Sequence, residues 1–257
     1  MGFKAANMAA VVRFNSANSS NFLDAYETYL HDTVQSSLNR PKSRTFAPSS
    51  FRCARKNWFR LRGTTPDVVQ IPDLSLQHTA EVGTARHTAI QSKLSKMLGQ
   101  DWIDVETYLS GIPDYPYDYT IQKAGFESRI SIQYPPIKFA CDGIVRWNNK
   151  LYLLEIKTSE YNSWEELTDP KSVHMDQVMC YSTLLQLPDV LMLYEDRQYG
   201  GMKCYEEHFS IDDMMHVKNK FDYIMEMVDH NLAPEKLPHA DYMCRNCEYQ
   251  KKCAEWG

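Results

Sequence analysis

The stretch from residue 139 to residue 158 constrains the fold of this chain more than any other. Two apolar runs are joined there by Asn148 and Asn149, and asparagine tolerates the positive backbone angles of a tight hairpin turn. If these two residues form the whole turn, Trp147 pairs with Lys150 across it. The stretch therefore predicts an antiparallel hairpin with a fixed register.

This register brings charged side chains together on one face of the hairpin. Counting back along both strands places Asp142 opposite Glu155, and Lys157 shares the face of Glu155 because side chains alternate with a period of two. Directly opposed like charges destabilise a sheet, so a fold keeps them where a positive group lies between them. A divalent cation with oxygen ligands fits that position. The alternative interpretation is a hairpin with a solvated charged face.

Length and charge place the chain in a broad class. A chain of 257 residues can bury a sizeable core, and no apolar run approaches the ~20 residues that a membrane span needs. The short apolar run near the N-terminus lacks the pattern of a secretory signal, so we expect no membrane partner. The net charge of −5 argues only mildly against a nucleic-acid partner, because the clustering of charge matters more than its sum.

Hydrophobic periodicity predicts helices and strands along the rest of the chain. Ser210 and Asp213 form a capping box that begins a long helix with Val217 and Phe221 on its apolar face. The other expected elements are a helix from Phe22 to about Leu38, a helix that opens at Gly83, a strand containing Glu127, a helix from Met175 to Leu187, and strands over Val190–Tyr194 and Lys203–Phe209.

A basic segment occupies residues 40–62, which contain eight Lys or Arg residues and no Asp or Glu. Aromatic residues are interleaved with the basic ones. Because basic side chains neutralise phosphates and aromatic rings stack on bases, the segment resembles a surface that binds single-stranded DNA. An amphipathic helix with a solvated basic side is the alternative. The candidate DNA-binding residues are Arg52, Arg55, Lys56, Trp58, Arg60 and Arg62.

Three of the seven cysteines lie close together near the C-terminus with the spacing C-x2-C-x5-C. They are Cys244, Cys247 and Cys253. Such a cluster favours metal ligation over a disulfide framework, but the spacing is not that of a zinc ribbon. Four thiolates are what an iron–sulfur cluster needs, so the set lacks one ligand.

The fourth ligand must come from another part of the chain. Cys141, Cys180 and Cys204 lie in predicted strands or a helix, where cysteine behaves as a small apolar residue. Cys53 remains, and its position in the basic polar segment makes it our candidate. A zinc site in which His239 or His230 replaces Cys53 is the competing interpretation.

Other candidate residues are identified by their position in predicted helices. His87 lies three residues before Ile90 and points to the same interior side, where a lone histidine is more often a satisfied core residue than a ligand. Gln177 and Tyr181 are four residues apart and share a helix face. They are either neutral donors to a site or an ordinary boundary pair.

Together these residues resemble the RecB-like branch of the PD-(D/E)XK nucleases, and in particular the CRISPR-associated and AddB-type iron–sulfur exonucleases. The resemblance runs from Cys53 to Cys253. It departs from the family pattern before Asp142, where Ala140 and Cys141 stand in place of the proline. The motifs that carry it are Gly83 to His87, Ala140 to Gly143, Glu155 to Lys157, Gln177 with Tyr181, and one early cysteine with three terminal ones.

The resemblance implies a role for each candidate residue. The groups that would hold one or two Mg²⁺ or Mn²⁺ ions are those of His87, Asp142, Glu155 and the Ile156 backbone carbonyl. Lys157 would orient the attacking water, Gln177 and Tyr181 would position the DNA strand, and Glu127 would be an outer-sphere acid. The implied ligands of a 4Fe–4S cluster are Cys53, Cys244, Cys247 and Cys253.

The fold that the resemblance implies is α/β and restriction-endonuclease-like, with a mixed central sheet flanked by helices and the hairpin at its centre. We expect an N-terminal extension with a helix over residues 1–39 and a single nuclease domain over residues 40–257. An iron–sulfur module formed by residues 50–62 and 240–257 would join the N-terminal and C-terminal segments of that domain.

The expected function is a metal-dependent DNA exonuclease that trims single-stranded ends in recombination, repair or related DNA processing. The expected partner is DNA that is single-stranded or has free ends, and by analogy the protein is cytoplasmic and bacterial or phage-encoded. The sequence leaves cleavage polarity and oligomeric state open, a homo-oligomer included. The alternative hypothesis is a DNA-binding iron–sulfur module with a vestigial or regulatory nuclease site. The presence of Asp142, Glu155 and Lys157 favours the enzyme.

Overall fold

The computed structural model describes residues 21–38, 43–67, 74–238, 241–245 and 247–256. The chain divides into two compact units, one of residues 1–41 with 69–78 and the other of residues 42–68 with 79–257. Helix α2 (Asn21–Leu38) belongs to the smaller unit and confirms the helix predicted there. The boundary predicted at residue 39 lies outside the described residues.

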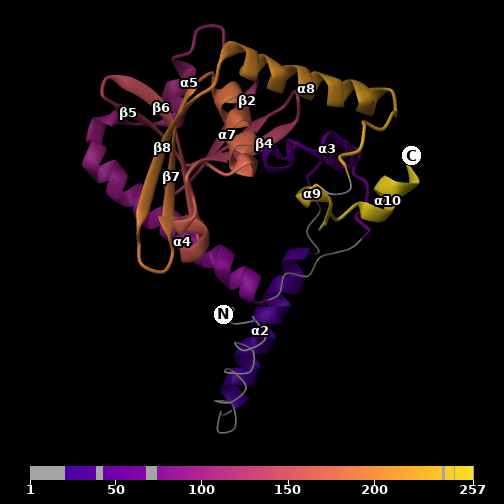
Figure 1. The fold of residues 1–257 in the computed structure, drawn as a ribbon, viewed down its shortest axis with the longest axis horizontal. Coiled ribbons are helices and arrows are strands. Elements are labelled where there is room, and N and C mark those ends of the chain that lie inside the picture. Colours follow the sequence, from indigo (N-terminus) through magenta and orange to yellow (C-terminus); the bar gives the residue numbers. More distant parts are fainter. Residues whose placement is uncertain (1–20, 39–42, 68–73, 239–240, 246, 257) are drawn as a thin grey trace. The chain divides into compact units, whose positions relative to one another are not determined.

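The larger unit contains a mixed five-stranded sheet in the order β1-β5-β6-β7-β8 (Figure 1). Strands β6 and β7 run parallel, and the other neighbours in this sheet are antiparallel. A three-stranded antiparallel sheet has the order β2-β3-β4. The strands are β1 (Trp102–Ile103), β2 (Tyr119–Ala124), β3 (Glu127–Ile132), β4 (Ile137–Cys141), β5 (Gly143–Trp147), β6 (Lys150–Ser159), β7 (Asp189–Asp196) and β8 (Met202–His208).

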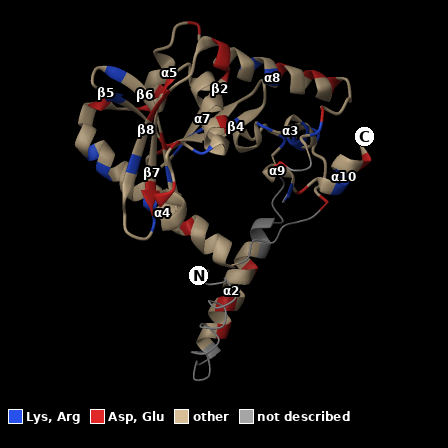
Figure 2. Ribbon diagram, in the orientation of Figure 1, with Lys and Arg blue, Asp and Glu red and all other residues tan. Residues whose placement is uncertain are grey.

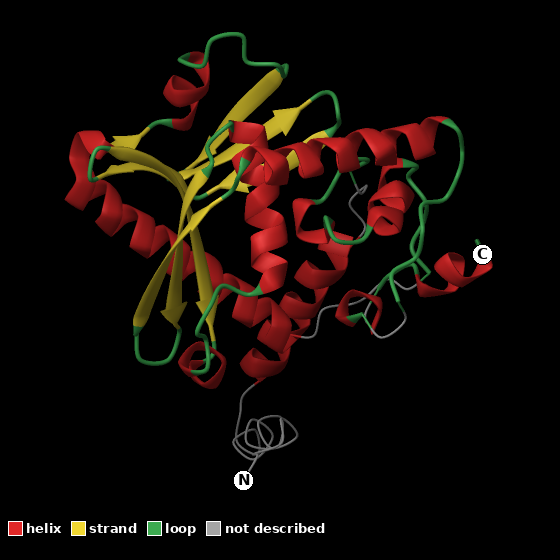
Figure 3. Ribbon diagram, turned by 45° about the horizontal axis from the view of Figure 1, so that its top comes forward, coloured by secondary structure: helices red, strands yellow, loops and turns green. Residues whose placement is uncertain are grey.

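Helices cover both faces of the five-stranded sheet (Figure 3), which confirms the predicted α/β class. On β6, Leu154 and Ile156 pack in one apolar cluster with Ile90 of α4 (Leu74–Leu98). The intervening Leu153 packs in the main core with Val178 of α7 (Ser172–Leu185). Because neighbouring side chains of a strand point to opposite faces, the two helices lie on opposite sides of β6. The remaining helices are η2 (Pro48–Ser50), α3 (Ala54–Leu61), η3 (Gly99–Asp101), α5 (Val105–Ser110), α6 (Tyr161–Glu165), α8 (Ile211–Asp229), α9 (Tyr242–Arg245) and α10 (Gln250–Glu255).

The predicted hairpin is confirmed as β5 and β6. Asn148 and Asn149 have φ angles of 49° and 67° and form the whole turn, with Trp147 paired to Lys150. One difference from the prediction concerns the first strand, which is broken in two: β4 belongs to the three-stranded sheet and β5 to the five-stranded sheet. Asp142 lies at the break between them.

Gly143 has a structural role at this break. A Cβ atom at this position would lie 2.8 Å from the Trp102 ring, so a larger residue would push the start of β5 away from β1. Gly83 of α4 differs from Gly143, because a Cβ there would lie 3.4 Å from the Thr158 hydroxyl, an ordinary contact distance. The prediction that a helix opens at Gly83 is wrong, because the helix begins at Leu74.

The other elements agree with the sequence analysis. Ser210 caps α8 and Asp213 completes the capping box. The strand with Glu127, the helix around Gln177 and the two strands that precede α8 are also present, with bounds within three residues of those predicted. None of the described helices has the length and apolarity that crossing a bilayer demands.

Candidate functional site

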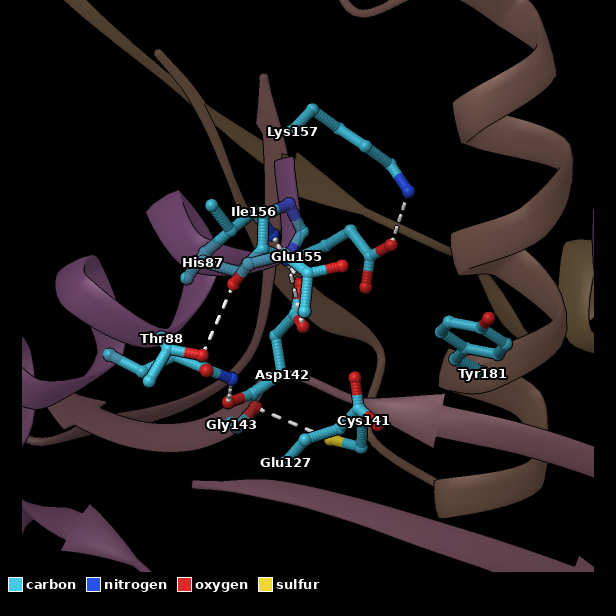
Figure 4. Close-up of polar contacts among 12 residues, drawn as sticks. His87, Thr88, Glu127, Cys141, Asp142, Gly143, Glu155, Ile156, Lys157 and Tyr181 are labelled. Carbon is cyan, nitrogen blue, oxygen red and sulfur yellow. Dashed lines mark hydrogen bonds and ion pairs between the residues drawn. The ribbon is translucent and has the colours of Figure 1, made fainter. Parts of the chain in front are cut away.

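The side chains of the predicted catalytic set open onto one cavity of about 390 Å³. The cavity lies where the two sheets separate, and helices α4 and α7 contribute to its wall. Figure 4 shows the charged residues of its centre. The predicted residues that line it are His87, Glu127, Asp142, Glu155, Lys157, Gln177 and Tyr181.

Asp142 is buried and held by its neighbours at the break between β4 and β5. One carboxylate oxygen, Oδ2, accepts a hydrogen bond from the backbone N–H of Ile156 at 2.8 Å. The other, Oδ1, lies 3.4 Å from Nδ1 of His87. Gln91 donates to the backbone carbonyl of Asp142 at 2.8 Å. The register of the hairpin and the helix α4 together fix this carboxylate.

Glu155 is buried on the neighbouring strand, and its two oxygens have different surroundings. Oε1 accepts a hydrogen bond from Nζ of Lys157 at 2.6 Å, whereas Oε2 is buried and has no hydrogen-bond partner among the described residues. Burial raises the pKa of Glu155 to about 7; the charge of Lys157 opposes this rise and that of Asp142 adds to it. An unsatisfied buried acceptor costs about 1–3 kcal/mol, and binding a cation would remove that cost.

His87 faces the same two carboxylates. Burial lowers the pKa of its imidazole, but the hydrogen bond to Asp142 and the charges of Asp142 and Glu155 outweigh burial, so the pKa is raised. His87 therefore faces the two acids of the cavity. It is not an ordinary core histidine.

Lys157, Gln177 and Tyr181 form a chain of hydrogen bonds along the cavity wall. Nζ of Lys157 donates to Oε1 of Gln177 at 3.0 Å, and Nε2 of Gln177 donates to the Tyr181 hydroxyl at 2.6 Å. Tyr181 also stacks on Phe139, with ring centroids 4.9 Å apart. Burial raises the pKa of Tyr181 well above its usual value, so the phenol is neutral. Gln177 and Tyr181 thus reach the site as neutral groups.

Besides Thr88 and Gln91, sequence reasoning missed the cavity residue Arg129. It follows Glu127 by two residues on β3, and both line the cavity. Nε of Arg129 donates to Oε1 of Glu127 at 3.0 Å. The alternation along β3 was the available signal, because residues two apart on a strand share a face.

The donor set of the cavity fits a hard divalent cation. Within the described ranges, no group of three or more His, Cys, Asp or Glu side chains is arranged as it would be around a metal ion. The residues nevertheless combine two buried carboxylates with an unsatisfied oxygen at Glu155, and carboxylate oxygens are what Mg²⁺ prefers. For Ile156 the structure gives a backbone N–H bond to Asp142 and a buried side chain.

A second cavity, of about 280 Å³, is lined by all four candidate cluster ligands. They are Cys53, Cys244, Cys247 and Cys253. Burial raises the pKa of Cys53, and the other three thiols raise it further because they lie close by. Four thiols around one cavity are a donor set that fits an iron–sulfur cluster.

The structure describes one of the two histidines that compete with Cys53 as the fourth ligand. His230 is exposed at the end of α8, where its Nδ1 lies 3.1 Å from the Glu226 carbonyl, and His239 lies outside the described residues. Cys141 and Cys180 are buried in the core as predicted. Cys204 is exposed on β8, contrary to the prediction of an apolar role.

The basic segment is largely part of the fold. Arg55 is 4% exposed and donates to the carbonyls of Pro234 and Cys253 at 2.6 and 3.2 Å. Trp58 is fully buried and donates through Nε1 to the Met227 carbonyl. The predicted contact of Arg55 and Trp58 with DNA is therefore corrected, because neither side chain is accessible to a strand.

Figure 2 colours the Lys and Arg positions of α3 blue. The other four residues of this set are partly accessible. Arg52 pairs with Asp241 at 2.9 Å, and Arg60 lies 3.9 Å from Glu248. Arg62 lies over the ring of Trp58, 4.4 Å from its centroid. Lys56 lines the cysteine cavity. The lack of acids within the segment is balanced by acids and carbonyls from the C-terminal part of the chain.

Comparisons with known proteins give little further information. No protein-family model and no curated protein matches the chain. Among solved structures, it is similar to the crystal structure of SSO0001, with 18% identity and a TM-score of 0.48 over 91% of this chain and 97% of that chain. A similarity this distant supports no conclusion about fold or function.

Proposed function

We propose that this chain is a divalent-metal-dependent deoxyribonuclease that trims single-stranded DNA ends, with the restriction-endonuclease-like fold of the RecB-like PD-(D/E)XK nucleases. One observation carries the proposal: Asp142, Glu155, Lys157 and His87 converge in one cavity, where a buried oxygen of Glu155 has no partner among the residues that the structure describes. A surface hairpin with solvated charges would not bury both carboxylates.

The proposed ligands of one or two Mg²⁺ or Mn²⁺ ions are His87, Asp142, Glu155 and the Ile156 backbone carbonyl. When bound, such an ion polarises water and neutralises charge on the phosphate. Nζ of Lys157 is held between Glu155 and Gln177, so its charge is fixed in place before substrate arrives. From there it orients the attacking water and stabilises the charge that develops on the phosphate. Gln177 and Tyr181 position the strand.

The four cysteines are proposed to hold a 4Fe–4S cluster that stabilises the fold. The support is the convergence on one cavity of the Cys53 thiol, at the N-cap of α3, with thiols of the C-terminal segment. Ligation by both segments would tie residues that are about two hundred positions apart, and a ligand that binds only the folded state stabilises it.

The decisive experiment is digestion of end-labelled single-stranded DNA by anaerobically purified protein with and without Mn²⁺. We expect degradation only with metal, and circular single strands should resist if ends are required. Lys157→Ala should lower the rate about 100-fold or more. Lys150→Ala is the matched control, since Lys150 lies on the same strand outside the cavity. A wild-type protein that binds DNA without degrading it would instead support the vestigial-site hypothesis.

A further inference from the structure

Arg129 is a cation on the wall of the catalytic cavity that the proposed chemistry does not use. Among the described residues, the Lys and Arg side chains that line this cavity are Arg129 and Lys157. Lys157 is already engaged by Glu155 and Gln177. A cavity with several carboxylates repels a polyanionic strand, so substrate binding calls for a second positive group.

The strands around Arg129 leave its side chain open to the cavity. Arg129 pairs with Ala140 of β4 and with Gln122 of β2, and Glu127 pairs with Ala124 of β2. Both alanines line the cavity, and their small side chains leave space beside the larger ones. The Arg129 side chain is 62% exposed.

Arg129 is also close enough to the catalytic carboxylates to contact the same strand. Its partner Ala140 precedes Asp142 by two residues, and both residues line the same cavity. Paired residues on adjacent strands lie about 5 Å apart. The guanidinium, on its flexible stem, can therefore reach a phosphate that neighbours one held at Asp142 and Glu155.

Glu127 restrains Arg129 through one of its nitrogens only. Nε donates to Glu127, and within the described part of the chain no other acceptor takes a hydrogen bond from this guanidinium. The two terminal NH₂ groups form a fork whose geometry matches phosphate oxygens.

We propose that Arg129 binds a backbone phosphate adjacent to the one that is hydrolysed, and that Glu127 holds the guanidinium until DNA displaces it. The inference rests on the proposed function and names the group that recognises its substrate. It gives Glu127 a restraining role rather than that of an outer-sphere acid. Because Glu127 competes with the phosphate for the same cation, removing its charge should favour DNA.

The test measures the binding of a fluorescein-labelled single strand in EDTA, by fluorescence anisotropy at a series of salt concentrations. Arg129→Ala should weaken binding about tenfold and lower the slope of log K against log salt by about 0.7. Arg129→Lys should restore the slope but only part of the affinity, since a lysine is not bidentate. Glu127→Gln should tighten binding. Arg146→Ala is the matched control, an exposed arginine of β5 paired with Asp101 at 3.4 Å outside the cavity.

The outcomes separate this inference from the proposed function. If wild-type protein degrades DNA but Arg129→Ala binds with an unchanged affinity and slope, the inference is wrong and the function stands. If the slope depends on Arg129 but no DNA is degraded with Mn²⁺, the phosphate site stands and the nuclease proposal fails. Weaker binding by Glu127→Gln would overturn the restraining role.

Discussion

Glu155 makes the stability of the metal-free protein depend on pH. Its pKa rises from 4.5 to about 7 because the carboxylate is buried. Between these values the folded state binds a proton that the unfolded state has lost, so unfolding becomes easier as pH rises. We expect the free energy of unfolding in EDTA to fall by about 1–3 kcal/mol from pH 5 to pH 7. Urea denaturation would measure it.

Glu155→Gln should remove most of this pH dependence, because the amide has no proton to lose; the raised pKa of His87 leaves a smaller fall near pH 7. Glu106→Gln provides the control, since Glu106 is an exposed residue of α5. A wild-type protein whose stability in EDTA is constant or rises over this range would contradict the burial argument.

A second prediction concerns the pair of carboxylates. Adding Mn²⁺ to metal-free protein should raise the melting temperature, because a ligand specific to the folded state stabilises it. Asp142→Asn should abolish that shift yet leave the apo protein at least as stable, since one of two neighbouring like charges is gone. Lys157→Ala should lose nuclease activity but keep the rise in melting temperature that Mn²⁺ causes. The shared-metal assignment fails if Asp142→Asn melts with an undiminished shift in Mn²⁺.

Helix α3 holds buried side chains in the folded protein. Substitutions at these buried residues should lower the free energy of unfolding and leave DNA binding unchanged. Trp58 is fully buried and contacts Trp256 with ring centroids 5.0 Å apart. Trp58→Ala should therefore cost about 3–5 kcal/mol of unfolding free energy. Arg55→Lys should also destabilise, because one ammonium cannot reproduce both carbonyl contacts.

These effects would be measured by denaturation, with the exposed Arg146→Ala as control. The salt dependence of DNA binding by Arg55→Lys should match that of wild type, since the charge is retained and buried. A reduced slope would show that Arg55 contacts DNA after all.

At the scale of the whole molecule, the cysteine cavity joins the beginning and the end of the larger unit. Closing so long a loop is entropically costly in the unfolded chain, so a cluster across it should contribute strongly to stability. Cys53→Ala or Cys247→Ala should lose iron and should melt at a lower temperature. Iron content and visible absorbance would be measured on anaerobically purified protein. Cys204→Ala should keep its iron, because Cys204 is exposed on β8. Full iron content in Cys53→Ala would refute the ligand assignment.

The sequence by itself determined the hairpin and its register. Two asparagines that accept positive φ fix a two-residue turn, and the period of two then decides which side chains share a face. The placement of Glu155 with Lys157, and of Gln177 with Tyr181, followed from such local periodicities. These are properties of neighbouring residues, so no distant contact was needed to infer them.

Only the tertiary structure decided which side chains are covered and which open to the cavity. Composition identified the basic segment, but Arg55 and Trp58 are buried by carbonyls and rings from residues 227–256. Arg129 reaches the cavity because β3 pairs with Ala140 beside the break at Asp142. Burial and accessibility depend on contacts between residues far apart in the chain, and residue type and spacing do not specify those contacts.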